Sequence, residues 1–234
     1  MPIRGLVIDG APVAWDEVPD SVMPPEIVNM MRPQNRDKEI HVSDLTICPY
    51  RVVRDKLTDV YIPMKTAAKM AQGKLLDELT ERYVRRDGEG VILQPKFVRE
   101  IVGVPLHLTP DLIDLVKGTI EDYKRPGSRL RSVPEHYEFQ LNAYRWGTQG
   151  QVPATIKKLI LNVLAPNETQ VFVVKKWNDL TIENEVHSRL NALHEVMADA
   201  ASGTVDLTCG DPTCMFCRPA KMIRLGEDYG FIED

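Results

Sequence analysis

The chain has 234 residues, of which 43% are hydrophobic and 27% are charged, and its formal net charge is −5 at pH 7. This length allows one substantial core, or one core with a small lobe. No apolar run is as long as a membrane span and the first twenty residues lack a secretory signal, so we expect a soluble, cytoplasmic protein with no membrane partner. The acidic balance counts mildly against a nucleic-acid partner, although a binding groove needs only local positive charge.

The first forty residues are rich in proline and show little periodicity. They predict an irregular N-terminal arm, residues 1–40, with one short helix near 25–31. Apolar spacing next predicts a helix that is capped by Ser43 or Asp44 and includes Leu57, and a second helix over 64–86.

Strand patterns follow from residue 91 onward. Alternating residues predict a strand over 91–101, and two more strands are predicted over 155–164 and 169–175. A helix is predicted over 135–146, and a long helix over 182–201, capped by Asn178 or Thr181. The order predicts a mixed α/β domain over residues 41–219, with a central sheet flanked by helices, and a C-terminal tail over 220–234.

The stretch 107–124 carries the first candidate chemistry. Asp111 follows a proline, and Asp122 and Lys124 end the next apolar run. Lys117-Gly118 predicts a tight turn between two strands, and a turn centred there places Asp111 roughly opposite Lys124. Asp114 is a rival for Asp111, but because side chains alternate along a strand the two should face opposite sides.

This predicted hairpin gathers two carboxylates and one ammonium at one end of a sheet. Carboxylate oxygens are the ligands that Mg²⁺ and Mn²⁺ prefer, and a neighbouring lysine can orient an attacking water or stabilise charge on a phosphate. The hypothesis is metal-assisted hydrolysis of a phosphodiester. The simpler interpretation of Asp-Tyr-Lys at 122–124 is a solvated strand end with a cross-strand ion pair.

The cysteines form a second pattern. Cys48 stands alone near the N-terminus, whereas Cys209, Cys214 and Cys217 lie close together near the C-terminus. The tight spacing and the intracellular setting favour metal or cluster ligation over disulfides. Four thiolates suit either an iron–sulfur cluster or Zn²⁺.

Pro110-Asp111, a spacer, and Asp122-Tyr-Lys124 resemble the signature of the PD-(D/E)XK nuclease superfamily. The RecB-like branch has a helix with a glycine and a metal ligand before this hairpin, and a Gln-x₃-Tyr helix after it. Those places are occupied here by Gly73 and Asp77, and by Gln140 and Tyr144.

One cysteine before this core and three after it resemble the iron–sulfur subgroup of the same branch. That subgroup includes the CRISPR-associated RecB-like exonucleases and the nuclease module of AddAB-type helicase–nucleases. The segment SDLTICPYR, which contains Cys48, resembles the N-terminal cysteine motif of the CRISPR-associated family.

The resemblance implies a restriction-endonuclease-like core and a DNA exonuclease that acts on single-stranded ends, in CRISPR spacer acquisition, phage recombination or repair. Partners would be DNA and CRISPR integrase or recombination proteins. Mg²⁺ or Mn²⁺ would be held by Asp77, Asp111, Asp122 and the carbonyl of Tyr123. Lys124 would orient or deprotonate water, and Gln140 and Tyr144 would contact the DNA backbone or support the site. Candidates for the incoming strand are Arg125, Arg129 and Arg131. The four cysteines would hold a 4Fe–4S cluster, with Zn²⁺ as the alternative.

Two departures from the family pattern keep alternatives open. The family usually has histidine where this chain has Asp77, with Glu78 beside it, so which of the two acids faces the metal is undecided. The spacing from Cys209 is Cys-x₄-Cys-x₂-Cys, whereas the family more often places the close pair first. The alternative functions are a DNA-end-binding module with weak or no cleavage, and a zinc-stapled protein with no nucleic-acid role.

Overall fold

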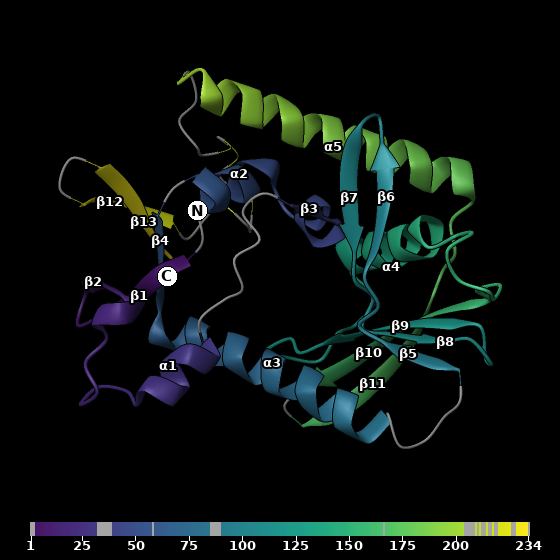
Figure 1. Cartoon of the computed structure of the whole chain (residues 1–234), viewed down its shortest axis with the longest axis horizontal. Helices are drawn as coiled ribbons and strands as arrows, with labels where there is room; N and C mark the ends of the chain where they lie inside the picture. Colours follow the sequence, from purple (N-terminus) through teal and green to yellow (C-terminus); the bar gives the residue numbers. More distant parts are fainter. Residues whose placement is uncertain are drawn as a thin grey trace. The chain divides into compact units, whose positions relative to one another are not determined.

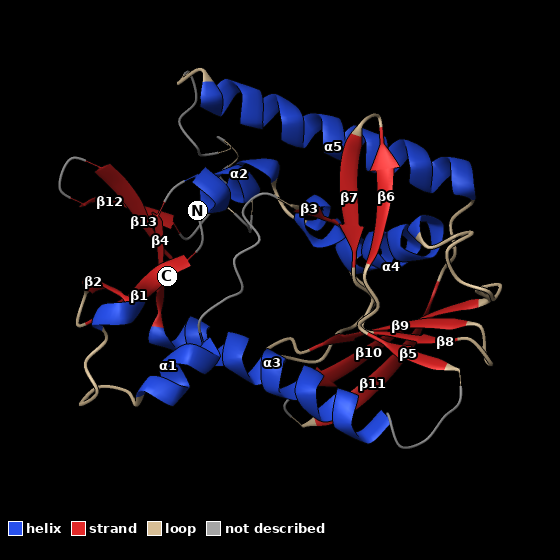
Figure 2. Cartoon of the chain, viewed as in Figure 1, coloured by secondary structure: helices blue, strands red, loops and turns tan. Residues whose placement is uncertain are grey.

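The computed structural model describes residues 3–31, 39–57, 59–84, 90–165, 167–203, 220–225 and 228–233, together with Cys209, Asp211, Cys214 and Cys217. Side chains are described for these residues except 3, 30, 31, 59, 60, 76–84 and 220–233. Helices and strands alternate along the chain in the mixed α/β pattern that the sequence predicts (Figure 1) (Figure 2).

The chain divides into two compact units. Unit 1 consists of Met1–Lys38, Cys48–Leu76 and Leu193–Asp234, and unit 2 consists of Glu39–Ile47 and Asp77–Ala192. Two long helices, α3 (Met64–Val84) and α5 (Asp179–Ala201), each contribute residues to both units.

Unit 1 contains a five-stranded mixed sheet. In spatial order its strands are β12 (Ala220–Leu225), β13 (Asp228–Glu233), β4 (Asp59–Pro63), β1 (Ile3–Ile8) and β2 (Ala11–Ala14). β4 is parallel to both of its neighbours, whereas β1–β2 and β12–β13 are antiparallel hairpins.

The N-terminal segment therefore differs from the predicted irregular arm. Ile8 pairs with Ala11 across the two-residue loop Asp9-Gly10, whose φ angles are 50° and 82°. Positive φ at both central residues is the type I′ turn that matches the twist of paired strands, and Asp-Gly is a favoured sequence for it. The hairpin signal was present in the sequence, although the surrounding prolines obscure it.

The remaining elements of unit 1 are two short helices and one 3-10 turn beside α3. They are η1 (Trp15–Glu17), α1 (Pro25–Met31) and α2 (Pro49–Leu57). α1 coincides with the short predicted helix. Apolar side chains from β1, β4, α1 and α3 form one core: Leu6, Trp15, Val18, Met23, Val28, Ile62, Ala67 and Ala71.

Unit 2 is built on two sheets. The larger has the spatial order β11 (Glu168–Val174), β10 (Lys158–Ala165), β9 (Thr119–Lys124), β8 (Leu112–Asp114) and β5 (Val91–Leu93). The smaller has the order β3 (Ile40–His41), β7 (Val104–Leu108) and β6 (Phe97–Ile101). β9 and β10 are parallel, so the larger sheet is mixed.

The predicted strand over 91–101 is divided between these two sheets. Gln94 has φ of 43° and is followed by a proline, so the backbone leaves the extended conformation between β5 and β6. The predicted helix ending at Leu57 is also divided, into η2 (Val42–Thr46) and α2, because Pro49 disfavours helical geometry at Cys48.

Helix α4 (Glu135–Gly147) packs against β9 and β10 and against η2. Its side chains and those of the sheet and α5 form a buried core that includes Phe139, Leu141, Ile120, Leu161 and Val186. Asn178 caps α5, since its Oδ1 accepts the backbone N–H of Thr181 at 2.8 Å, as the sequence predicts. This packing fixes α4 over the end of β9 where the candidate active site lies.

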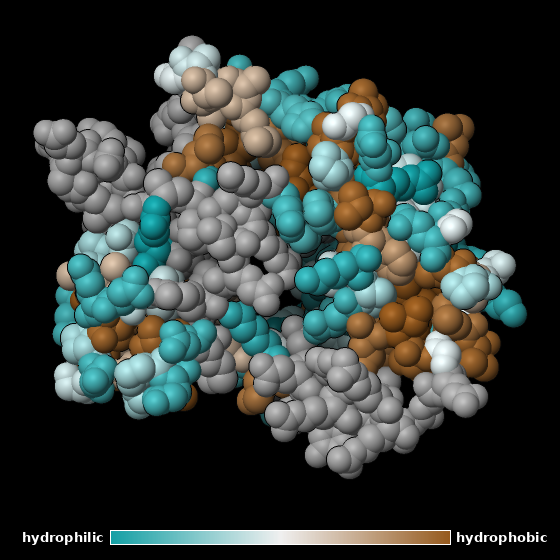
Figure 3. Space-filling view, in the orientation of Figure 1, coloured by the Kyte–Doolittle hydropathy of each residue, from teal (hydrophilic) through white to brown (hydrophobic). Residues whose placement is uncertain are grey.

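The face shown in Figure 3 carries polar and apolar residues side by side. Exposed apolar side chains are scattered, such as Val102 and Val116 at hairpin turns and Val171 and Val173 on β11. Among the residues described, no helix combines the length and the apolar character that a bilayer crossing requires.

Candidate active site and cysteine cluster

The β8–β9 hairpin carries the predicted carboxylates, but its register differs from the prediction. Leu112 pairs with Glu121 and Asp114 with Thr119, so the register extended by one residue places Asp111 opposite Asp122 rather than Lys124. The turn spans 115–118 instead of centring on Lys117-Gly118. Because the two carboxylates share a position across the strands, they lie on the same face of the sheet.

Asp114 explains the shifted turn. Its Oδ1 accepts the backbone N–H of Lys117 at 2.8 Å, and its Oδ2 lies 2.9 Å from the Lys117 Nζ. The backbone hydrogen bond lowers the pKa of Asp114 below its ordinary value. Gly118 completes the turn with φ of 63°, where a Cβ would lie 2.6 Å from the Thr155 carbonyl oxygen. Asp114 is thus a turn residue, which leaves Asp111 as the candidate ligand.

Asp111, Asp122 and Lys124 come together at the end of the hairpin. The Oδ2 of Asp111 accepts the backbone N–H of Tyr123 at 2.7 Å. The Nζ of Lys124 lies 3.0 Å from Oδ1 and 2.8 Å from Oδ2 of Asp122. Asp122 is only 2% exposed, so this ion pair is enclosed by protein.

Burial and charge act against each other in this group. Burial raises the pKa of Asp122 above its ordinary value, against the opposing effect of Lys124. Burial alone would lower the pKa of Lys124, but the charges of Asp122 and Asp111 outweigh it and raise that pKa. Lys124 therefore stays protonated and pairs with Asp122, while the charge of Asp111 acts on it from nearby. Carboxylate oxygens gathered in this way suit binding of a divalent cation.

The first turn of α4 covers Lys124. The Nζ of Lys124 lies 5.5 Å from the ring centroid of Tyr137, and the rings of His136 and Tyr137 meet edge to face at 4.1 Å. Burial, and then the charge of Lys124, lower the pKa of His136. Both side chains were missed as site residues because the sequence shows them only as part of a helix; their place directly before the Gln-x₃-Tyr pattern was the available signal.

Gln140 and Tyr144 lie deeper in the same helix. The Nε2 of Gln140 donates to the Oη of Tyr144 at 2.8 Å, and each residue is 5% exposed. The pair is satisfied within the core, an arrangement that suits support of the site better than contact with a substrate.

The loop between β9 and α4 carries Arg125, Arg129 and Arg131, all exposed. Arg129 pairs with Glu168 at 3.3 Å. Gln170 on β11 holds the middle of the loop, because it accepts the Leu130 N–H at 2.8 Å and donates to the Leu130 carbonyl at 3.0 Å. The arginines are therefore presented from an anchored loop.

Two further predicted residues are placed less directly. Asp77 belongs to α3, but its side chain and that of Glu78 lie outside the described residues. The side chain of Tyr123 alternates with that of Asp122 and donates to Glu121 Oε2 at 3.3 Å; burial and Glu121 raise the pKa of Tyr123 to about 12, so the phenol stays neutral. Only its backbone carbonyl is thus a candidate metal ligand.

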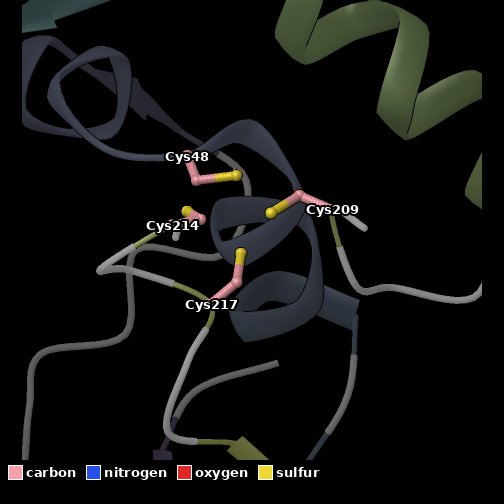
Figure 4. Close-up of side chains that lie close together, drawn as sticks. All are labelled: Cys48, Cys209, Cys214 and Cys217. Atoms are coloured by element: carbon pink, nitrogen blue, oxygen red, sulfur yellow. The ribbon is translucent and has the colours of Figure 1, made fainter. Parts of the chain in front are cut away.

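The prediction that the four cysteines gather is confirmed. The sulfur atoms of Cys48, Cys209, Cys214 and Cys217 point toward one another and all lie within 4.8 Å (Figure 4). Cys48 directly precedes α2, where its carbonyl accepts the Val52 N–H at 3.2 Å. The other three come from the C-terminal segment, in which the Cys217 N–H donates to the Cys214 carbonyl at 3.2 Å.

No disulfide joins any two of these four cysteines. Burial raises the pKa of Cys48 and, together with hydrogen bonding to Cys209 and Cys48, raises that of Cys217 strongly. Four crowded thiols ionise together only around a cation, so the group suits a metal ion or a cluster. Both a zinc ion and a four-iron cluster take four thiolate ligands, so sulfurs gathered within 4.8 Å suit either one.

No family model matches this sequence, and no curated protein is similar to it. Among solved structures, the crystal structure of SSO0001 is similar with a TM-score of 0.53 and 18% identity, over 71% of this chain and 82% of that one. A phage-related exonuclease from Haemophilus somnus 129PT gives a TM-score of 0.38 and 10% identity, over 57% of this chain and 71% of that one. A protein from Eubacterium rectale assigned as an exonuclease gives a TM-score of 0.37 and 16% identity, over 69% of this chain and 64% of that one. The similarity to SSO0001 shows a shared fold and nothing more. The TM-scores of the two exonuclease structures are too low to show a shared fold.

Proposed function

We propose that this protein is a divalent-metal-dependent DNA exonuclease that hydrolyses phosphodiester bonds at single-stranded ends. The observation that carries the proposal is the grouping of Asp111, Asp122 and Lys124 at the end of the β8–β9 hairpin. The two carboxylates lie opposite each other across the hairpin, and Asp122, which is buried, pairs with Lys124. The resemblance of the sequence to RecB-like PD-(D/E)XK nucleases supports the same conclusion.

The residues fit Mg²⁺ or Mn²⁺. Asp111 and Asp122 offer hard carboxylate oxygens, the Tyr123 carbonyl adds a third oxygen, and Asp77 is the proposed ligand from α3. When bound, such an ion lowers the pKa of a coordinated water and offsets the charge that develops on a phosphate. The Tyr123 N–H holds Asp111 at 2.7 Å, so one carboxylate is oriented before any ion arrives.

Lys124 is the proposed catalytic cation. Because nearby carboxylates keep it protonated, it acts by orienting water and donating a hydrogen bond to a phosphate oxygen, rather than as a base in the resting protein. Tyr137 limits the freedom of its Nζ from the other side. Gln140 and Tyr144 are proposed positioning residues: they are hydrogen-bonded to each other within α4, which packs against β9.

The DNA strand is proposed to follow the anchored loop after β9. Arg125 and Arg131 are exposed there, and Arg129 pairs with the surface carboxylate of Glu168. Exposed pairs of this kind are weak, so exchange of Glu168 for a phosphate costs little.

For the cysteine group we propose a structural role in unit 1, where it joins the residue before α2 to the C-terminal segment. The family resemblance favours a 4Fe–4S cluster, and Zn²⁺ is the alternative because four thiolates suit it equally well. Either occupant contributes to folding, because its ligands are brought together only in the folded chain.

A second candidate function is a DNA-end-binding module with weak or no cleavage. The presence of Asp77 where the family has histidine favours it. In either case the proposed setting is DNA processing in CRISPR spacer acquisition, phage recombination or repair, with integrase or recombination proteins as partners.

The test uses single-stranded DNA labelled at one end, with Mg²⁺, Mn²⁺ or a chelator. We expect progressive shortening from an end that requires the metal and is lost in Asp122→Asn, whereas Asp114→Asn retains it because that carboxylate serves the turn. DNA retention without shortening at any metal concentration would favour the binding module.

A further inference from the structure

We propose a further metal site, separate from the proposed nuclease site and from the cysteine group, in which Glu39, His41 and His107 bind one Zn²⁺ ion. All three belong to unit 2, and their ligand atoms lie within 4.8 Å of one another. The family resemblance assigns no role to any of them.

Strand pairing brings the two histidines together. β3 is parallel to β7, and His41 is the partner of His107 in the register. Partners on neighbouring strands project to the same face of a sheet, and the two imidazole centroids are 5.2 Å apart. Glu39 precedes His41 by two residues, so alternation places it on that face as well.

The distances suit a single ion. The Oε2 of Glu39 lies 3.0 Å from the Nε2 of His41 and 3.9 Å from the Nδ1 of His107. Zinc binds nitrogen and oxygen ligands at about 2.0–2.1 Å, so tetrahedral neighbours lie about 3.4 Å apart. The two observed distances fall on either side of this value, and the third pair of ligand atoms, in His41 and His107, lies within 4.8 Å.

The ligand types select the metal. Imidazole suits zinc and other late transition ions, whereas Mg²⁺ prefers oxygen ligands. Two histidines and one glutamate are a zinc ligand set that leaves a fourth position for water. Asp111 and Asp122 offer oxygens alone and suit a harder ion. The carboxylate site and the histidine site should therefore bind different metals.

The surroundings allow an ion to enter and hold two ligands in place. Glu39 is half-exposed, while the side chains of His41 and His107 are 11% and 25% exposed. The backbone N–H of His41 donates to Asp44 Oδ2 at 3.0 Å, which fixes the start of η2. On the other side of His107 lies Val98, its partner on β6.

The ion would strengthen a short connection. β3 has only two residues, and its pairing with β7 holds the segment 39–47 on unit 2. An ion shared by both strands adds a cross-link that exists only in the folded protein, so zinc should raise the unfolding temperature.

Calorimetric titration of Zn²⁺ into the full chain, purified with its cysteine site filled, tests the proposal. We expect the wild type to bind one further equivalent of zinc, and we expect His107→Gln and His41→Gln not to bind it. Glu39→Gln should weaken it about 10-fold or more, since even loss of a group behind a metal ligand costs that much. His194→Gln, which changes a histidine outside the group, should retain it, as should Asp111→Asn.

A pH series separates metal binding from simple loss of structure. Because a metal and a proton compete for the same imidazole nitrogen, acidification should weaken binding of the further zinc equivalent. Because Glu39 is half-exposed, Glu39→Gln should unfold at the wild-type temperature without zinc yet lose the zinc-dependent increase. An unchanged zinc stoichiometry in both His107→Gln and Glu39→Gln would overturn the site and leave the nuclease proposal untouched.

Discussion

Replacement of Asp111 by asparagine separates metal binding from folding. The Oδ2 of Asp111 accepts the Tyr123 N–H at 2.7 Å, and the asparagine carbonyl can accept the same bond. The bond loses only its charge-assisted part, about 1 kcal/mol. The metal-free variant should therefore unfold within about 2–4 °C of the wild type. Asp111→Ala removes the acceptor altogether and should cost about 1–3 kcal/mol.

Metal-dependent stability should respond differently. A ligand at one hundred times its Kd stabilises a protein by about 2.7 kcal/mol, which corresponds to an increase of about 5–11 °C for a chain of this size. Asp111→Asn removes one of two facing carboxylates and should abolish most of the increase with Mn²⁺. The loss of cleavage should be at least about 100-fold, because the ion and its water are no longer held.

The assay pairs thermal unfolding, with and without Mn²⁺, with hydrolysis of end-labelled single-stranded DNA. Asp114→Asn is the matched control: it alters a carboxylate of the same hairpin, and should lower the metal-free unfolding temperature while it retains the Mn²⁺ response. If Asp111→Asn keeps both the Mn²⁺ response and cleavage, Asp111 is not a metal ligand.

Four further predictions concern the same sites. Lys124→Ala should reduce cleavage by about 10²- to 10⁴-fold with Mn²⁺ affinity retained, measured by kinetics and thermal shift; normal cleavage would remove Lys124 from the mechanism. Because burial raises the folded-state pKa of Asp122, the metal-free protein should lose stability as pH rises from about 4 through that pKa. Denaturant titrations should show that the free energy of unfolding depends less on pH in Asp122→Asn than in the wild type. Cys48→Ser should lose the bound metal and solubility together. In the wild type, a brown colour with visible absorption indicates an iron–sulfur cluster, whereas a colourless protein with one bound zinc indicates Zn²⁺. Asp77→Ala should weaken the metal dependence of cleavage and Asp77→His should retain it; if Glu78→Ala is the damaging change instead, the other acid is the ligand.

Local sequence patterns were sufficient for most elements. The periodic segments now seen as α1, α4 and α5 were predicted to within a few residues, because helical spacing and caps such as Asn178 act within one or two turns. The Asp9-Gly10 hairpin was equally local and was overlooked. The split of 91–101 into β5 and β6 was harder to foresee, since Gln94 adopts positive φ only where the strands of two different sheets meet.

The candidate site shows where local information ends. The sequence supplied the acids, the lysine and the cysteines, because their chemical types and order do not depend on folding. The register that places Asp111 opposite Asp122 was decided by how the turn uses Asp114, and the burial of Asp122 by elements that pack on the sheet, among which α4 contacts β9.

The tertiary structure decided contacts that no sequence pattern indicated. His41 pairs with His107 across two strands far apart in the chain, whereas the meeting of Cys48 with the C-terminal cysteines was predicted through the family resemblance. Such contacts depend on the free energy of packing the whole core, to which each local pattern contributes only a part. The sequence by itself thus determined which chemical groups the protein has, and the fold determined which of them share a charge, a proton or a metal.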